Sequence, residues 1–491
     1  MTNHLPVLVF LIPLGVAVAL PLVSLARPRW CRSVAMSAVG LMSLTAVINL
    51  ALVVTHGETR YVFGGWAAPL GIEWVADGLA SAVLVAISLI AFVCLVYGGA
   101  VTLQASPSRT RLHYILILLL LSGLTGVVFA GDLFNVFVFL EVATLSTCAL
   151  VAIADGKALV FAFRYLMLAS IGATFYLLGV SFVYAVTGTL NMSDLAARLP
   201  GLAGSHALNV GVVFMFLGLA IKMALMPFHG WLPDAYTNAS DAVSPLISAL
   251  VTKVSLLAWI RIMYWVVGAG QDTELGQALR VCWVLGAVAA VVGAFLALIQ
   301  HDVKRMFAYG GVSHIGLITL GAGLGNQTGL AGSLFYLIND AVMQATLFVV
   351  AGIAVTHYGV HTVEQLGTLR RKAPWLAGAL VVVGLSMIGI PPTGGFFGKW
   401  YIVLGAIQAG EYAAVAAVVV ATLLTLAYFA SLFVRVFGGE TTAPPDGVAA
   451  EMPLRLRWCV GVLCVGIVSL GLLSDRLVGV LLGVTVSLQL S

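Results

Sequence analysis

The residues from Leu217 to Lys253 read LGLAIKMALMPFHGWLPDAYTNASDAVSPLISALVTK, and this stretch is the most informative about the fold. Lys222 lies inside one apolar run and Lys253 inside the next, with Pro227 and Pro233 interrupting the helix between them. A lysine at the centre of a bilayer costs about 2.5–3.5 kcal/mol on insertion scales, so each one needs a partner or a hydrated cavity. Broken backbone is tolerated at membrane depth only where it is buried or lines a cavity. This stretch therefore predicts a path for ions or protons.

The composition is that of a polytopic membrane protein. Hydrophobic residues make up 61% of the chain and charged residues 9%, whereas a soluble globular protein is about 25% charged. No cleavable signal is evident, because the first apolar run is long enough to span and leads directly into arginines. We predict an all-α fold of about 14 transmembrane helices, near residues 5–26, 33–55, 79–100, 113–130, 133–154, 163–186, 208–227, 242–266, 277–299, 306–324, 328–356, 376–407, 411–437 and 458–485.

The basic residues are divided unequally between the loops that join these spans. Fifteen of the 23 lysines and arginines fall in odd-numbered loops and five in even-numbered loops. The remaining three, Lys222, Lys253 and Lys399, lie inside spans. Because cytoplasmic loops carry the excess of positive charge, we expect the odd-numbered loops in the cytoplasm and both termini on the outer side.

The cysteine and histidine pattern does not predict a redox or metal centre. The six cysteines form no CxxC pair and no Cys/His cluster with metal spacing, and most lie in apolar spans, where thiols behave as small hydrophobes. The chain also lacks a Walker lysine motif, HExxH and GxSxG. We expect no cofactor, no bound metal, no nucleic-acid partner and no enzymatic activity of its own, so that the driving force comes from an ion gradient or a partner.

Three further ionisable residues lie well inside spans. Glu141 has no lysine or arginine within a helical turn or two, and helical periodicity places Thr144 on its face. Such a carboxylate pairs with another helix or takes up a proton. His314 can carry a proton near pH 7, and Asp340 is a second buried carboxylate, with Asn339 placed to share its proton. The alternative for Glu141 and His314 is a neutral residue hydrogen-bonded for packing.

The polar loop between the two lysines has two interpretations. His229 is a candidate for proton access, and Asp241 is best explained as an N-cap of the eighth helix. The alternative is an interfacial loop held by a tryptophan anchor and aspartate caps. Lys222 could also snorkel to the interface, because Pro227 follows five residues later.

A second broken helix lies in the second half of the chain. The run SMIGIPPTGGFFGKWYIVLG contains two prolines and two glycines before Lys399. Paired interrupted helices in two halves predict an inverted repeat with the working site at the repeat interface. We expect spans 4–8 to match spans 9–13. The predicted divisions are N-terminal scaffold helices at 1–112, a first repeat at 113–266, a second repeat at 277–437, and a cytoplasmic loop with the last helix at 438–491.

The predicted membrane interior thus contains acids, bases and a histidine in alternation. Lateral proton transfer requires such an arrangement, because each group can hold a proton and each neighbour's charge changes its proton affinity. A sugar or drug carrier would instead show an aromatic-lined pocket and fewer buried lysines. The predicted proton-transfer residues are Glu141, Lys222, Lys253, His314, Asp340 and Lys399.

Three long motifs resemble one known family. KMALMPFHGWLPDAY…SPLISALVTK, QHDVKRMFAYGGVSHIG and GIPPTGGFFGKW are similar to the antiporter-like membrane subunits, which comprise the proton-pumping membrane subunits of respiratory complex I and the large subunits of Mrp-type sodium/proton antiporters. The resemblance covers roughly residues 132–437. It implies 14 transmembrane helices, two inverted five-helix repeats, and broken helices seven and twelve.

The resemblance also implies residue roles. The helix-five glutamate of the family matches Glu141 and its helix-seven lysine matches Lys222, and these two form a functional ion pair in relatives. The helix-eight lysine, the helix-ten histidine and the helix-twelve lysine match Lys253, His314 and Lys399. Some relatives carry a glutamate at the last position, so Lys399 argues against that subtype.

One departure from the family pattern concerns Gln344. Many relatives have a histidine near residues 339–340 and a lysine at the position of Gln344, which cannot be protonated at working pH. The proton path is then either rerouted through Asp340, or this half couples weakly.

Within the family, a chain that ends soon after the fourteenth span is most similar to the D-type component of Mrp antiporters. We therefore expect a proton-translocating subunit of a multi-subunit Mrp-type sodium/proton antiporter in the plasma membrane of a prokaryote. Its partners would be a larger homologous subunit and small hydrophobic subunits. The ions that it moves would be protons and sodium. The alternative is a proton-pumping subunit of a complex I-like or hydrogenase-like redox assembly. A third possibility, which Gln344 favours, is a structural subunit that docks partners and does not conduct.

Overall fold

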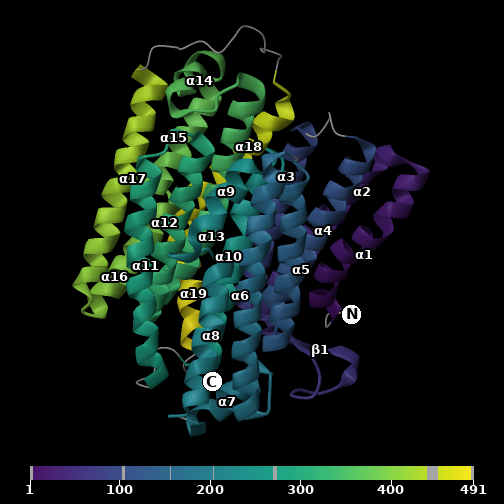
Figure 1. Cartoon of the computed structure of the whole chain (residues 1–491), viewed down its shortest axis with the longest axis vertical. Helices are drawn as coiled ribbons and strands as arrows, with labels where there is room; N and C mark the ends of the chain where they lie inside the picture. Colours follow the sequence, from purple (N-terminus) through teal and green to yellow (C-terminus); the bar gives the residue numbers. More distant parts are fainter. Residues whose placement is uncertain are drawn as a thin grey trace.

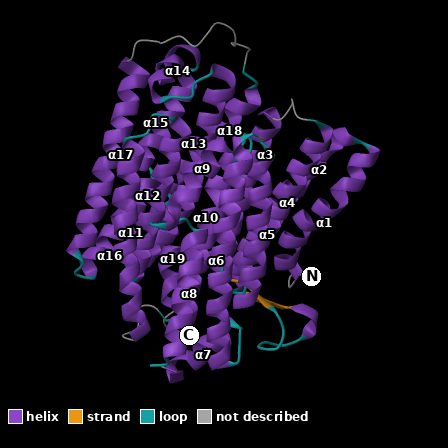
Figure 2. Cartoon of the chain, in the orientation of Figure 1, coloured by secondary structure: helices purple, strands orange, loops and turns teal. Residues whose placement is uncertain are grey.

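The computed structural model describes residues 4–101, 106–154, 156–202, 204–268, 274–438 and 452–487, and these residues are almost entirely helical (Figures 1 and 2). The α-helices of the first half are α1 Leu5–Ala26, α2 Cys31–His56, α3 Gly78–Val101, α4 Pro107–Phe129, α5 Leu133–Ala152, α6 Lys157–Thr187, α7 Met192–Arg198, α8 His206–Lys222, α9 Trp231–Asn238 and α10 Ser244–Arg261. Those of the second half are α11 Glu274–Leu298, α12 Val303–Gly323, α13 Gln327–Tyr358, α14 Gly367–Lys372, α15 Pro374–Ile388, α16 Gly394–Gln408, α17 Tyr412–Gly438, α18 Leu454–Leu472 and α19 Ser474–Ser487.

The remaining regular structure is short. Strands β1 (Thr59–Val62) and β2 (Glu73–Ala76) form an antiparallel hairpin between α2 and α3. Short 3₁₀ turns lie at Pro28–Trp30, Phe63–Gly65, Leu199–Leu202, Phe228–Gly230 and Val363–Leu366, and a π-helical turn continues α10 at Ile262–Val266.

The apolar runs predicted from the sequence all lie on helices. By length and composition, 11 helices of the described residues are able to cross a membrane, and α8 and α15 are shorter apolar helices. The protein is therefore an all-α polytopic membrane protein. Three predicted runs are shorter or divided: 208–227 ends as a helix at Lys222, 376–407 is split into α15 and α16, and 458–485 into α18 and α19.

The helix break after Lys222 has a local cause. Ala224 takes a positive φ of 57°, and Pro227 has no backbone N–H to donate to a continuing helix. The end of a helix leaves carbonyl groups without partners. Trp231 compensates for one of them, because its Nε1 donates to the Ile221 carbonyl at 2.9 Å.

The second break depends on glycine. Gly389, just after α15, has a φ of 90°, which favours glycine. Gly395, the second residue of α16, lies so close to α15 that a Cβ atom there would lie 1.8 Å from the Ser386 carbonyl oxygen. Its backbone N–H donates to Ser386 Oγ at 3.2 Å.

The beginnings of α5 and α12 share one local structure. Asp132 caps α5 and forms an isolated antiparallel bridge with Asn191, and Asp302 caps α12 and forms the same bridge with Thr362. Each bridge is closed by two backbone hydrogen bonds of 2.9–3.1 Å. The segments that follow Asn191 and Thr362 lead to α7 and α14, which lie at opposite ends of the molecule in Figure 1.

Helices α10 and α13 form the centre of the molecule. Every residue of α10 is buried, and α13 packs against α10, α12 and α16. The helices α1 and α2 lie on one side in Figure 1 and α16 and α17 on the other. Because Lys253 and Asp340 lie on these central helices, their charges are kept from lipid and must be satisfied by neighbouring helices.

The structure corrects the interpretation of Asp241. The residue that precedes α10 is Val243, with no side-chain cap, and Pro245 occupies the first turn. Asp241 instead forms an ion pair with Lys304 in the first turn of α12. A tertiary partner has therefore replaced the expected local one.

Candidate functional site

The first buried ion pair joins α5 and α8. Lys222 Nζ lies 2.5 Å from Glu141 Oε1 and donates to Thr144 Oγ1 at 2.8 Å. Glu141 and Thr144 are three residues apart on one helix, so both side chains reach the same ammonium group. The Lys222 side chain is 4% exposed and that of Glu141 is 26% exposed, so the lysine does not snorkel, and the carboxylate lies nearer to the surface of the chain.

The position of Lys222 also suits a cation. It is the last residue of α8, and the free carbonyl groups at the C-terminus of a helix carry a partial negative charge. The helix break therefore places the ammonium group where both a carboxylate and a helix end stabilise it.

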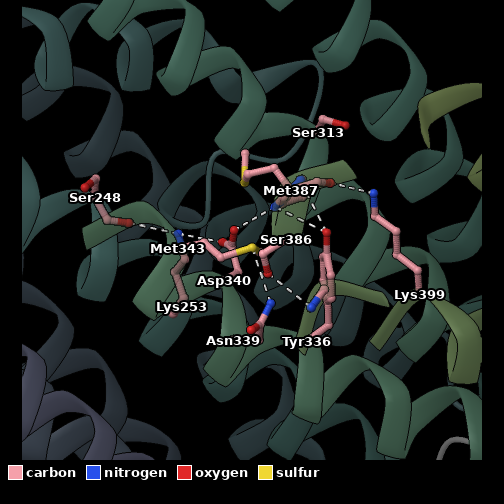
Figure 3. A network of polar contacts seen from close by, with 12 residues as sticks. Ser248, Lys253, Ser313, Tyr336, Asn339, Asp340, Met343, Ser386, Met387 and Lys399 are labelled. Carbon is pink, nitrogen blue, oxygen red and sulfur yellow. Dashed lines mark hydrogen bonds and ion pairs between the residues drawn. The ribbon is translucent and has the colours of Figure 1, made fainter. Parts of the chain in front are cut away.

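The second cluster is centred on Asp340, which is fully buried (Figure 3). Asp340 Oδ2 lies 2.8 Å from Lys253 Nζ, and Asp340 Oδ1 lies 2.8 Å from His314 Nδ1. Lys253 also donates to the Ser248 carbonyl at 2.8 Å. A buried carboxylate is costly unless it is paired and hydrogen-bonded, and here both oxygens have a partner.

Tyr336 extends this cluster and was not predicted from the sequence. Its hydroxyl lies 3.3 Å from His314 Nε2 and 3.4 Å from Nδ1. The available signal was its spacing, since Tyr336 precedes Asp340 by one helical turn on α13 and so shares its face. A tyrosine in a membrane helix is an ordinary packing residue, so the residue type alone did not indicate a functional role.

Lys399 lies apart from both ion pairs. It is buried, and its Nζ donates to the carbonyls of Met387 at 2.8 Å and Ile388 at 3.1 Å. In the part of the chain that the structure describes, no carboxylate forms an ion pair with it. The end of α15 supplies its partners, again as expected for a cation at a helix C-terminus. Figure 3 shows Lys399 directed at Met387.

The amides next to Asp340 do not behave as expected. Asn339 Nδ2 contacts Met343 Sδ at 3.4 Å and does not share a proton with Asp340. Gln344 is buried, and within the described ranges neither atom of its amide has a hydrogen-bond partner. The Gln344 amide faces Gly311 of α12, where a Cβ atom would lie 3.1 Å from its Nε2.

The loop after Lys222 is tied to α12 by charged residues. Besides the Asp241–Lys304 pair, Asp234 of α9 lies 3.4 Å from Arg305 and 3.9 Å from Arg164. His229 belongs to neither buried cluster; its ring lies 6.1 Å from that of Tyr309 between centroids. Over the described residues, no group of three or more histidine, cysteine, aspartate or glutamate side chains is placed to hold a metal ion.

The structure therefore brings five of the six predicted residues into two clusters, Glu141–Lys222 and Lys253–Asp340–His314, with Lys399 separate. Acid–base pairs at the ends and centres of buried helices are typical of the class of ion-translocating membrane subunits. The family model for the transmembrane region of NADH:quinone oxidoreductase and Mrp antiporter proteins matches residues 130–425. The chain belongs to this family of antiporter-like membrane subunits.

Individual relatives include both branches of the family. The chain is 40% identical over 455 residues to the N-type component of the NADH-quinone oxidoreductase of Desulforudis audaxviator, covering 92% of this chain and 90% of the relative. It is 31% identical to the D-type component of the Na(+)/H(+) antiporter of Alkalihalophilus pseudofirmus, covering 81% and 80%.

Solved structures give the same result. A chain of the Mrp complex from Dietzia sp. superposes with a TM-score of 0.88 at 27% identity, covering 99% of this chain and 97% of that one. A chain of the archaeal membrane-bound sulfane sulfur reductase superposes with a TM-score of 0.90 at 26% identity, covering 99% and 98%.

Proposed function

We propose that this chain is the proton-translocating subunit of a multi-subunit membrane assembly, and that protons move along Glu141, Lys222, Lys253, Asp340, His314 and Lys399. The observation that carries the proposal is the pairing of buried charges on central and broken helices. Lys222 is held at 2.5 Å from Glu141, and Asp340 is held between Lys253 and His314. Ionisable residues at this depth are costly and are a sign of a functional path.

One cluster is suited to releasing a proton and the other to accepting it. A carboxylate beside a lysine favours the charged lysine, so opening the Glu141–Lys222 pair lets the lysine release its proton. Lys253 is stabilised by Asp340 in the same way, and His314 on the other oxygen of Asp340 can accept a proton and become a paired imidazolium. Breaking one pair thus changes the electrostatic environment of the next group, and with it that group's proton affinity.

The proposed architecture has 14 transmembrane helices in two inverted five-helix repeats, at 113–266 and 277–437. Its broken helices seven and twelve are α8 with α9, and α15 with α16. The matching bridges Asp132–Asn191 and Asp302–Thr362 support this arrangement, because the same local structure recurs once in each half. Residues 1–112 would be scaffold helices, and both termini would lie on the outer side of a prokaryotic plasma membrane. The proposed cytoplasmic loop at the start of 438–491 falls largely on residues 439–451, outside the described residues.

Two assemblies are compatible with this chain. In the first, it belongs to an Mrp-type sodium/proton antiporter with a larger homologous subunit and small hydrophobic subunits, and its 31% identity to the D-type component of such an antiporter supports this choice. In the second, it belongs to a redox-driven complex I-like pump, which the 40% identity to the N-type component of an NADH-quinone oxidoreductase favours. In neither case does the chain carry a cofactor of its own.

One experiment separates these assemblies. The tagged chain is purified from its native membrane in a mild detergent, and co-purifying proteins are identified by mass spectrometry. Small hydrophobic proteins with one larger homologue would support the antiporter, whereas soluble iron–sulfur or flavin proteins would support the redox-driven pump. Transport by the reconstituted complex tests the shared proposal: if it falls only when the whole chain is removed, and never on substitution of Glu141 or Lys222, the role of this chain is structural.

A further inference from the structure

We propose that Tyr336 is a further proton-transfer residue, whose hydroxyl passes protons between His314 and Lys399. The inference rests on the proposed function and identifies the group that closes the gap between the Asp340 cluster and Lys399. Its basis is the order of contacts Asp340–His314–Tyr336, together with the packing of Tyr336 against the helix that carries Lys399.

The first step of the argument concerns the protonation of the His314 ring. An ionised carboxylate can only accept hydrogen bonds, so Asp340 Oδ1, at 2.8 Å, holds the hydrogen of a neutral ring on Nδ1. Nε2 is then left with its lone pair. The Tyr336 hydroxyl lies 3.3 Å from Nε2 and 3.4 Å from Nδ1; since Nδ1 carries its hydrogen, Nε2 is the nitrogen that can accept from it. The aspartate thus sets the histidine to receive a proton from the tyrosine.

The second step concerns the position of the tyrosine relative to Lys399. Its ring packs on Gly398 of α16, where a Cβ atom would lie 2.4 Å from Tyr336 Cδ2. Gly398 directly precedes Lys399, and the absence of a side chain there lets Cβ, Cγ and Cδ2 of Tyr336 pack against the backbone next to the lysine. In Figure 3, Tyr336 lies between Asp340 and Lys399.

The third step concerns what Lys399 lacks. Its Nζ donates to the carbonyls of Met387 and Ile388, which accept a hydrogen bond but have no proton to pass on. A hydroxyl both accepts and donates. Asp340 of its own helix and Tyr428 of α17 are the titratable groups whose charge acts on the Tyr336 hydroxyl. Its hydrogen-bond contacts within the described residues are the two ring nitrogens of His314.

The transfer itself balances without any other reactant. Lys399 Nζ leaves the two carbonyls and donates to Tyr336 Oη. One N–H bond of the ammonium breaks as a new O–H bond forms on Oη, while the original O–H proton of Tyr336 moves to His314 Nε2. Lys399 becomes neutral, Tyr336 is unchanged, and His314 becomes an imidazolium stabilised by Asp340. The same path runs in reverse.

The test uses the intact complex reconstituted in lipid vesicles. Tyr336→Phe removes the hydroxyl and keeps the ring, and we expect proton transport to fall by about tenfold or more, as for the loss of a positioned proton-transfer group. The matched control is Tyr176→Phe. That tyrosine is equally buried, and its hydroxyl donates to the Leu133 carbonyl at 3.0 Å, outside the cluster. Normal transport by Tyr336→Phe would overturn the inference.

Two further arms make the result specific. Lys222→Ala measured in parallel tests the proposed function: transport lost in that variant but normal in Tyr336→Phe rejects only the role of Tyr336, whereas normal transport in both rejects the proposed function itself. Incorporation of 3,5-difluorotyrosine at position 336 keeps the hydroxyl and makes the phenol more acidic. We expect the rate and its pH dependence to change, whereas a packing role leaves both as in the unmodified complex, even if Tyr336→Phe fails to assemble.

Discussion

Asp340 and Lys253 form an ion pair of 2.8 Å between two helices from different halves of the chain, and their side chains are 0% and 4% exposed. Lys253 lies on α10, and Asp340 lies on α13 beside His314 of α12. The pair therefore connects the half that contains Glu141 and Lys222 to the half that contains His314 and Lys399. A change of charge on either partner is felt directly in the other half, because a buried pair is screened very little.

The first prediction concerns this pair. Asp340→Asn replaces the carboxylate by a neutral amide, whose single oxygen can accept from only one of Lys253 and His314. Lys253 then loses its counter-charge, and breaking a buried pair on one side costs about 3–5 kcal/mol. We expect a lower melting temperature of the purified complex and loss of proton transport. The control is Asp194→Asn, which breaks the partly exposed Asp194–Arg198 pair and should leave the melting temperature of the complex almost unchanged, because solvent screens exposed pairs. Transport at the normal rate in Asp340→Asn would contradict the proposed path.

The second prediction separates charge from hydrogen bonding at Glu141. Glu141→Gln keeps a side-chain oxygen for Lys222, so the helices should still pack and the complex should assemble, but the carboxylate is gone and we expect transport to be lost. Thr144→Val removes the 2.8 Å hydrogen bond from Lys222, together with the bond that the Thr144 hydroxyl donates to the Leu140 carbonyl within α5, and keeps the ion pair. Transport by this control should fall by no more than about tenfold, equivalent to one hydrogen bond of about 1.4 kcal/mol. Vesicle acidification assays would measure both variants, and equal rates would argue against a role for the charge.

The third prediction concerns the ion pair between Asp241 and Lys304. Asp241 lies in the loop after the break that follows Lys222, and Lys304 in the first turn of the helix that carries His314. Lys304→Glu places two like charges together and should release this loop, with reduced yield of the complex. Adding Asp241→Lys reverses both charges, and we expect recovery of about 1–3 kcal/mol of interaction free energy. Thermal unfolding of the two single variants and the double variant measures the coupling, and additive effects would mean that the pair does not hold the loop.

Much of the fold followed from the sequence because the bilayer imposes simple rules. A helix that crosses lipid needs a long apolar run, and a charge at depth is rare enough to stand out. For these reasons the helical positions and the residues Lys222, Lys253 and Asp340 were all recognisable. The breaks were recognisable from proline and glycine, although the last turns of the seventh run were expected to be helical and are not.

What the sequence did not provide is the choice of partners. Asn339 was expected to share the proton of Asp340, but Asp340 pairs with residues of two other helices, because pairing depends on how three helices are rotated when they pack. The same reason explains Asp241. It was expected to cap α10, but it forms an ion pair with Lys304 of α12. Tyr336 could be found only when the position of its hydroxyl relative to His314 was known.

The fourth prediction concerns Gly395, in the first turn of α16. A methyl group at position 395 would lie 1.8 Å from the Ser386 carbonyl oxygen, which belongs to the backbone of α15 and cannot move without disturbing that helix. Gly395→Ala should therefore force α15 and α16 apart, at a cost of about 3 kcal/mol or more. It should also move Lys399 away from the carbonyls of Met387 and Ile388.

The matched control is Gly378→Ala on α15, where a Cβ atom meets nothing within 4 Å. Alanine is the better helix former by about 0.8–1.0 kcal/mol, so this variant should be as stable as the unmodified protein or slightly more stable. Thermal unfolding of the purified complex compares the two substitutions directly. Equal stability of Gly395→Ala and Gly378→Ala would mean that the close approach at the second break does not determine where Lys399 is held.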